Sequence, residues 1–228
     1  MNMPVFARII LAVLLTVFLC LGGALLVLSL NRPAQPEPPS PLDQPRHMQG
    51  IAMPEFSLVD QDNRLQTRAG LIDGNVTIVG FVFSRCPLAC PGMMLQMSKL
   101  SESLRDTSVR LASFSIDPAY DGPEQLTEFA GRFGADTARW RLLTEPRGGA
   151  ITQVARKMLS ENFREHIRED ESTKITVSTG EMANIEHPPH LFLVGPRGEV
   201  LGRYNSTRPD EMEALAAHAR AAGAANKP

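Results

Sequence analysis

Two cysteines and one histidine are the residues whose types and spacing could do chemistry in this sequence. Cys86 and Cys90 lie between the apolar run VTIVGFVF, residues 76–83, and the start of a predicted helix. If the first turn is helical, four steps of about 1.5 Å place the two Cα atoms about 6 Å apart on one side of the chain. A disulfide can span that distance, and two thiolates so placed can also share a metal ion.

The loop around the cysteines is compatible with both a disulfide and a shared metal ion. A helix N-terminus carries a partial positive charge and stabilises thiolates. Pro87 and Pro91 each follow a cysteine and stiffen the loop, which lowers the entropy lost when a ligand binds. The spacing differs from the CxxC of the usual thioredoxin redox motif, and an inert structural disulfide is a further interpretation.

His187 precedes residues 191–194, which are predicted to form a buried strand. If that strand lies beside strand 76–83, the histidine can approach the cysteine loop as a third ligand. Two thiolates select soft copper, and an added imidazole gives a set suited to Cu(I), or to Cu(II) with further donors. A lone histidine is more often an ordinary surface or core residue. His190 is expected to point elsewhere. The other histidines are expected to be solvated: His47, His166 and His218.

The elements that must position these residues alternate between strands and helices. Strands are predicted at 76–83, 109–116, 140–143, 191–194 and 199–204, after a hairpin near 55–65. Helices are predicted after residue 91 and at 123–133, 149–162 and 209–222, and the charged stretch before residue 180 is expected to be a solvated hairpin or loop. Methionines 93, 94 and 97 recur at helical spacing and are predicted to be core residues.

This order implies parallel βαβ pairing followed by antiparallel edge strands. It predicts an α/β domain with a thioredoxin-like fold and an extra N-terminal hairpin. In open α/β sheets the reactive site lies at the carboxyl ends of the strands, and the cysteine loop follows directly after residue 83.

The N-terminal region has a different character. Residues 9–30 carry no charge and are long enough to cross a hydrocarbon core of about 30 Å. A cleaved signal peptide would have a shorter apolar region and a small-x-small cleavage site, and lipid-modified cysteines follow small residues, unlike Cys20. The sequence predicts a cytoplasmic N-terminus (1–8), a single transmembrane helix (9–30), a Pro-rich linker (31–50) and a globular domain (51–228).

The compartment follows from this organisation. The eight residues before the span leave no room for an organelle transit peptide. The sequence therefore predicts a bacterial inner membrane with the globular domain facing the periplasm, an oxidising compartment in which close thiols form a disulfide, a redox couple or a metal site. The net charge of −2 and the scattered Lys and Arg residues argue against a nucleic-acid partner.

Longer motifs carry a family resemblance. The chain resembles the Sco/SenC family, membrane-anchored copper chaperones of thioredoxin fold for cytochrome oxidase assembly. The resemblance covers most of residues 51–205 and rests on FVFSRCPLACP, SIDPAYDGPEQL, WRLLT and a histidine eight residues before the Gly-Pro of VGPRGE. His187 has that spacing and His190 does not. The resemblance implies Cys86, Cys90 and His187 as ligands of copper, either Cu(I) or Cu(II).

The resemblance also implies that Asp117 and Asp121 lie near the site or face a partner, although turn and N-cap chemistry would account for them too. Leu88 and Ala89, between the cysteines, are apolar where many relatives are polar. The prolines at 188 and 189 resemble the cis-proline that faces the reactive cysteines of thioredoxins, which favours a redox function.

Two functions are the main hypotheses, and two weaker ones follow. The first is a copper metallochaperone, a binding protein rather than an enzyme, that delivers one copper ion to the copper-bearing subunit of a cytochrome oxidase. It would need an upstream copper donor and a thiol reductant. The second is a periplasmic thiol-disulfide oxidoreductase or redox sensor that uses Cys86 and Cys90 as a redox-active disulfide. A peroxidase is a weaker hypothesis because Phe83 occupies the usual threonine position, and a tethered binding module with an inert disulfide is the last alternative.

Overall fold

The computed structural model describes residues 50–145, 154–155, 168–177 and 179–225, together with a few positions between 6 and 22. The chain divides into two units, Met1–Glu37 and Pro38–Pro228. Apart from those few positions, the predicted span at 9–30 lies outside the described residues, as does the predicted linker up to residue 49. Among the described residues, no helix combines the length and apolar character needed to cross a membrane.

A seven-stranded sheet forms the centre of the second unit, in the order β2-β1-β5-β4-β3-β8-β9. Strands β3, β4 and β5 are parallel, whereas β8 pairs antiparallel with β3, and β1 antiparallel with β5. This confirms the predicted thioredoxin-like layout, with the extra hairpin β1–β2 at one edge. The strands are β1 (Ser57–Asp60), β2 (Leu65–Thr67), β3 (Thr77–Val82), β4 (Arg110–Ser115), β5 (Trp140–Thr144), β8 (His190–Val194) and β9 (Val200–Asn205).

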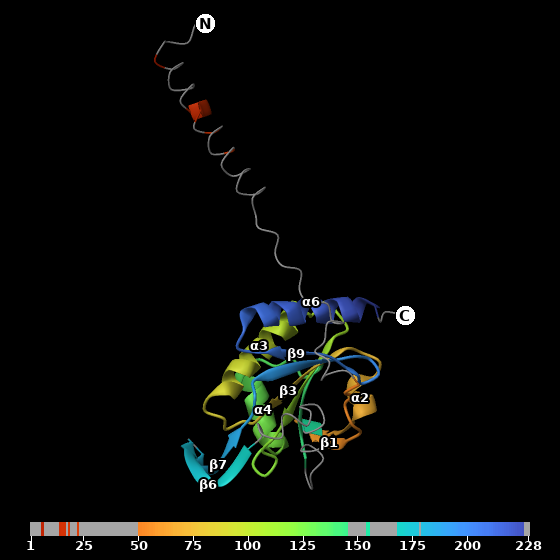
Figure 1. The fold of residues 1–228 in the computed structure, drawn as a ribbon, viewed down its shortest axis with the longest axis vertical. Coiled ribbons are helices and arrows are strands. Elements are labelled where there is room, and N and C mark those ends of the chain that lie inside the picture. Colours follow the sequence, from red (N-terminus) through yellow and green to blue (C-terminus); the bar gives the residue numbers. More distant parts are fainter. Residues whose placement is uncertain are drawn as a thin grey trace. The chain divides into compact units, whose positions relative to one another are not determined.

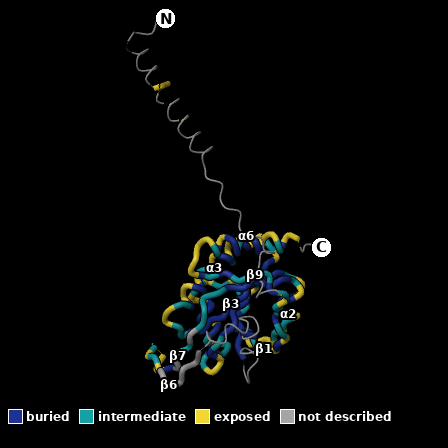
Figure 2. Tube along the Cα trace, in the orientation of Figure 1, coloured by how far each residue is buried: buried dark blue, intermediate teal, exposed yellow. Residues whose placement is uncertain are grey.

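Helices cover both faces of this sheet, and in Figure 1 α3 and α4 lie to one side of β3 while α2 lies to the other. Side chains alternate along β3, so Ile78 and Val82 join the core under α3, α4 and α6, whereas Val79 and Phe81 join the core under α2. All of β3 is buried, as Figure 2 shows in dark blue. The helices are α2 (Arg68–Ile72), α3 (Ala89–Ser103), α4 (Pro123–Arg132) and α6 (Pro209–Ala225). Of the predicted helix at 149–162 only residues 154 and 155 are described, and both are helical.

The charged stretch before residue 180 belongs to a separate two-stranded sheet, β6 (Arg168–Val177) and β7 (Gly180–Glu186). Among the hairpin side chains that the structure describes, some face solvent and others pack against the core. Lys174 and Thr176 are exposed, whereas Ile175 and Val177 pack against the first core together with the buried Met182. Strand β7 ends one residue before His187, so this packing helps to set where the histidine stands.

Gly80 lets α3 approach β3 closely, with the buried methionines of α3 filling the space between them as predicted. A Cβ atom on Gly80 would lie 2.9 Å from Cδ2 of Leu191 and 3.2 Å from Sδ of Met97. We expect Gly80→Ala to lower the free energy of unfolding by about 1–3 kcal/mol, because these side chains must leave their packed positions.

Urea unfolding of Gly80→Ala and of the matched control Gly131→Ala measures this effect. A Cβ on Gly131 meets no atom within 4 Å, and the residue lies in α4, so the control should be stabilised by about 0.5–1 kcal/mol. Equal transition midpoints for Gly80→Ala and the wild type would contradict the close approach of α3 to β3.

Candidate metal centre

Cys86, Cys90 and His187 come together at the carboxyl end of β3, so the structure unites the three side chains that the sequence singled out. Their ligand atoms all lie within 4.8 Å of one another. The Sγ atom of Cys90 is 3.3 Å from Nε2 of His187. Both cysteines are free thiols rather than a disulfide.

The turn after β3 places the two sulfur atoms at different depths. Cys90 lies in the first turn of α3 and is fully buried, whereas Cys86 precedes the N-cap residue Leu88 and is half-buried. The Cys90 N–H points at Sγ of Cys86 at 3.5 Å, and the Phe83 N–H points at Sγ of Cys90 at 3.4 Å. Backbone donors therefore help to fix both sulfur atoms close to each other.

The two thiols differ in acidity. Hydrogen bonding by the Cys90 thiol, and then by His187 and the backbone at Cys90 and Leu88, outweighs burial and lowers the pKa of Cys86 to about 4. Burial raises the pKa of Cys90. Cys86 is therefore the thiol that ionises first, and the proton that the pair keeps lies on Cys90. A soft cation can take the place of that proton, because cysteine binds metals in its thiolate form.

His187 reaches the cysteines because β8 pairs with β3. Gly80 stands opposite Leu191 in this antiparallel pair, so the residues just before β8 lie beside the loop that follows β3. Pro188 and Pro189 have no N–H to donate to a neighbouring strand, so the ladder stops there and the chain turns. No peptide bond among the described residues is cis, so these prolines share with the cis-proline of thioredoxins only their place before the strand.

The imidazole of His187 is oriented by two neighbours. Its Nδ1 lies 3.2 Å from the carbonyl oxygen of Pro188, which favours the tautomer with the proton on Nδ1. In that tautomer the lone pair of Nε2 could bind a metal, whereas a proton on Nε2 would be donated to the cysteine sulfur atoms when no metal is bound. The Phe83 ring meets the imidazole edge to face, with centroids 5.8 Å apart.

Asp121 fastens the cysteine loop to β4. Its fully buried carboxylate accepts hydrogen bonds from the Ser84 N–H at 3.0 Å, from the Ser84 hydroxyl, and from the Ser115 hydroxyl at 2.5 Å. Burial outweighs these hydrogen bonds and raises the pKa of Asp121. Asp121 thus links Ser84, two residues before Cys86, to Ser115 in β4, the strand that follows α3 in the sequence.

Asp117 holds the next residue of the same loop. Nε of Arg85 donates to Oδ2 of Asp117 at 2.6 Å, and the guanidinium lies 4.5 Å from the centroid of the Tyr120 ring. Because both aspartates are buried, the expectation that they face a partner is wrong, whereas their position near the site is confirmed. Of the turn and N-cap interpretation, the turn is confirmed, because the N–H groups of Tyr120 and Asp121 donate to the carbonyl oxygen of Asp117. The N-cap part is wrong, because Gly122 occupies the N-cap position of α4.

Sequence reasoning missed Ser84 and Ser115, whose only signals were their places as the first residues of the SRC and SID segments. It also misplaced His218, which is buried with Nδ1 2.6 Å from the Tyr204 hydroxyl. His190 begins β8 and stands outside the cluster, as predicted. His47 and His166 lie outside the described residues.

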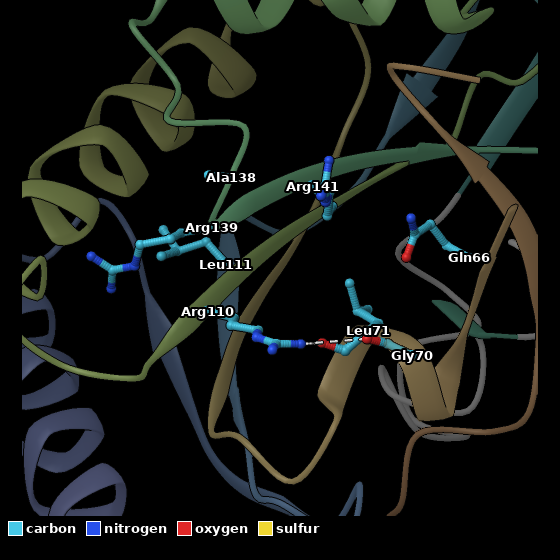
Figure 3. A pocket seen from close by; sticks show the side chains of 8 residues that line it. All are labelled: Gln66, Gly70, Leu71, Arg110, Leu111, Ala138, Arg139 and Arg141. Carbon is cyan, nitrogen blue, oxygen red and sulfur yellow. Dashed lines mark hydrogen bonds between the residues drawn. The ribbon is translucent and has the colours of Figure 1, made fainter. Parts of the chain in front are cut away.

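A cavity of about 160 Å³ lies at the opposite end of the parallel strands (Figure 3), lined in part by Arg110 at the start of β4 and Arg139 just before β5. Figure 3 shows the Arg110 guanidinium directed at the backbone of Gly70 and Leu71, and it also pairs with Asp73 at 3.1 Å. This guanidinium ties β4 to the segment around α2, at the end of the sheet away from the cysteine loop.

Comparison with known proteins agrees with this fold. The SCO1/SenC family model matches residues 45–222. The SCO1 protein homolog of Bacillus subtilis (strain 168) is 30% identical over 152 residues, 66% of this chain and 72% of that protein. BsSco, a member of the Sco family of cytochrome c oxidase assembly proteins in which a disulfide switch was identified, has a TM-score of 0.58 and 25% identity, covering 76% of this chain and 94% of its own. Arabidopsis thaliana ScoI with copper bound has a TM-score of 0.59 and 20% identity, covering 75% and 99%, a likeness of fold.

Proposed function

Because the chain belongs to the SCO1/SenC family, we propose that it binds one copper ion through Cys86, Cys90 and His187 and delivers it to a cytochrome oxidase during assembly. The observation that carries the proposal is the convergence of two sulfur atoms and one imidazole nitrogen within 4.8 Å. Soft thiolates with one borderline-soft nitrogen favour Cu(I). A relative of the same fold has been solved with copper bound.

The unequal depth of the two sulfur atoms supports delivery as well as binding. Cys90 is buried and offers a fixed ligand, while the half-buried Cys86 can be reached from solvent. An incoming thiolate can therefore replace Cys86 while Cys90 still holds the ion. Such ligand exchange passes copper on without changing its oxidation state.

The proposal includes a place and partners. Residues 9–30 would anchor the chain in a bacterial inner membrane, with the domain on the periplasmic side near the copper-bearing oxidase subunit. The uncharged run of 22 residues and the prolines that follow support this arrangement. The proposal also requires a protein that supplies copper to this chain. It requires a thiol reductant as well, because the cysteines bind metal only when reduced.

An anaerobic titration tests the proposal. The full chain, reduced and in detergent, competes with a chromophoric chelator for Cu(I). We expect one tight equivalent for the wild type and at least about 10-fold weaker binding for His187→Ala, since changes merely around a metal ligand already cost about 10- to 100-fold. His190→Ala is the matched control and should bind like the wild type. Equal Cu(I) affinities for His187→Ala and the wild type would show that His187 is not a copper ligand.

Thiol-disulfide exchange is the second candidate, and the free, unequally exposed thiols favour it. The Cys86 thiolate would attack a partner disulfide, and Cys90 would then displace the partner thiol, so that the partner is reduced and this chain oxidised. The disulfide switch of BsSco shows that a protein of this fold can carry such a bond. Full restoration of cytochrome oxidase activity by His187→Ala, in cells that lack the native protein, would support thiol-disulfide exchange against copper binding.

A further inference from the structure

We propose that an apolar surface beside Cys86 docks the protein that exchanges copper with this chain, and that this partner presents its own thiolates from an uncharged, apolar loop. The inference rests on the proposed function and adds the chemistry of the partner. It comes from the exposed side chains that follow Cys86, which the metal site itself does not use, because at Leu88 only the backbone contacts Cys86.

The surface consists of Pro87, Leu88, Pro91, Gly92 and Leu95, here called the apolar stripe. All five residues are exposed, with 86% of Leu88 and 50% of Leu95 accessible to solvent. Positions 88, 91, 92 and 95 follow the helical pattern i, i+3, i+4, i+7, so they share one side of the beginning of α3. The stripe therefore starts at the rim of the metal centre and continues along the helix.

The segment that forms the apolar stripe carries no charge. Residues 86–98 include no Asp, Glu, Lys or Arg. Arg85, on the other side of Cys86, is paired with Asp117 at 2.6 Å and covers the ring of Tyr120, so its charge is already compensated. A charged partner loop would lose hydration here without gaining a counter-ion, whereas an apolar loop would gain from burial.

Metal exchange brings the partner onto the apolar stripe. Cys90 is fully buried, so the ion is reached from the side of Cys86, which is followed directly by Pro87 and Leu88. In the exchange a copper–sulfur bond to the partner forms and the bond to Cys86 breaks. The partner thiol gives its proton to water, and no electron is transferred. A polypeptide that brings a sulfur atom to Cys86 along this segment would lie against Leu88.

The test compares Cu(I) transfer from the full chain, in detergent, to two synthetic peptides that carry a Cys-x3-Cys pair. One peptide has leucine and phenylalanine around the cysteines, and the other has aspartate at those positions. We expect the wild type to load the apolar peptide about tenfold faster, because only that peptide can bury its flanks on the stripe. Leu88→Asp and Leu88→Lys should both lose this preference. Leu65→Asp, at a leucine that is 70% exposed in β2, is the matched control and should keep it.

Cu(I) affinity against a small chelator, measured on the same samples, separates the two proposals. Both Leu88 variants should keep the wild-type affinity, which also shows that they fold. A wild type that fails to bind Cu(I) contradicts the proposed function and this inference with it. Tight binding combined with unchanged transfer by Leu88→Asp contradicts the docking surface alone. If one Leu88 variant transferred Cu(I) to the apolar peptide faster than the wild type and the other variant transferred it more slowly, the contact would be electrostatic and the inference would be overturned.

Discussion

Cys86→Ser and Cys90→Ser are each expected to abolish tight Cu(I) binding, with a loss of more than about 100-fold in affinity. Changing a residue that merely supports a metal ligand costs about 10- to 100-fold, so removing the ligand itself should cost more. A serine oxygen is a hard donor that stays protonated, whereas Cu(I) prefers soft thiolates. At Cys90 the replacement is fully buried, so water cannot easily supply a substitute ligand.

The chelator competition described above measures this loss. Cys20→Ser is the matched control, because Cys20 lies in the predicted membrane span, outside the described residues. It should bind one equivalent of Cu(I) with wild-type affinity. Tight Cu(I) binding by Cys90→Ser would contradict the assignment of the buried sulfur as a ligand, whatever the result for Cys86→Ser.

Asp121→Ala is expected to cause the largest loss of stability among the variants considered. The substitution removes the acceptor of two donors on Ser84 and one on Ser115, in a place that water does not reach. Buried donors without partners cost about 1–3 kcal/mol each, and with some rearrangement of the hydroxyls we expect about 2–4 kcal/mol in total. The cysteine loop would lose its attachment to β4 at the same time.

Urea unfolding at several pH values tests both the size and the sign of this effect. The pKa of Asp121 is raised in the folded protein, so the folded state holds its proton more tightly than the unfolded state. The stabilising contribution is fully present below the ordinary carboxyl pKa of about 3.9 and falls as pH rises through the raised pKa. The difference between wild type and Asp121→Ala should therefore be larger at pH 4 than at pH 7. A difference that grows with pH would show that the ionised form is the stabilised one.

Asp106→Ala is the matched control for that experiment. Asp106 is an exposed carboxylate paired with Arg220, and surface pairs of this kind add little to stability. Its transition should coincide with that of the wild type. A loss as large as that of Asp121→Ala would show that removal of any carboxylate unfolds the protein.

The fold prediction rested mainly on the spacing of apolar residues along the sequence. The six residues of β3 are apolar or small and buried on both faces, and the apolar positions of α3 recur at helical spacing, so both elements could be found from the sequence. The cysteine pair was recognisable because its spacing is local. His187 was placed by the expected pairing of its strand with strand 76–83, and the register of Gly80 with Leu191 brings it to the site.

The parts that sequence could not supply depend on contacts between distant segments. Ser84 and Asp121 are 37 residues apart, and nothing in either neighbourhood marks them as partners. Aspartates in a turn motif are ordinarily solvated, so the burial of Asp117 and Asp121 shows only when β4 lies beside the cysteine loop. His218 was misplaced for the same reason, because its partner Tyr204 belongs to another element.

The distance in sequence between the two kinds of ligand has a consequence for biosynthesis. Cys90 and His187 are 97 residues apart, and they meet only through the pairing of β3 with β8. At about 5–20 residues per second, a ribosome needs about 5–20 s to travel from the second cysteine to the histidine. For that interval the nascent chain carries both thiols without the imidazole. Early oxidation or capture of a wrong cation would thus act on the dithiol alone, before the third ligand has been translated.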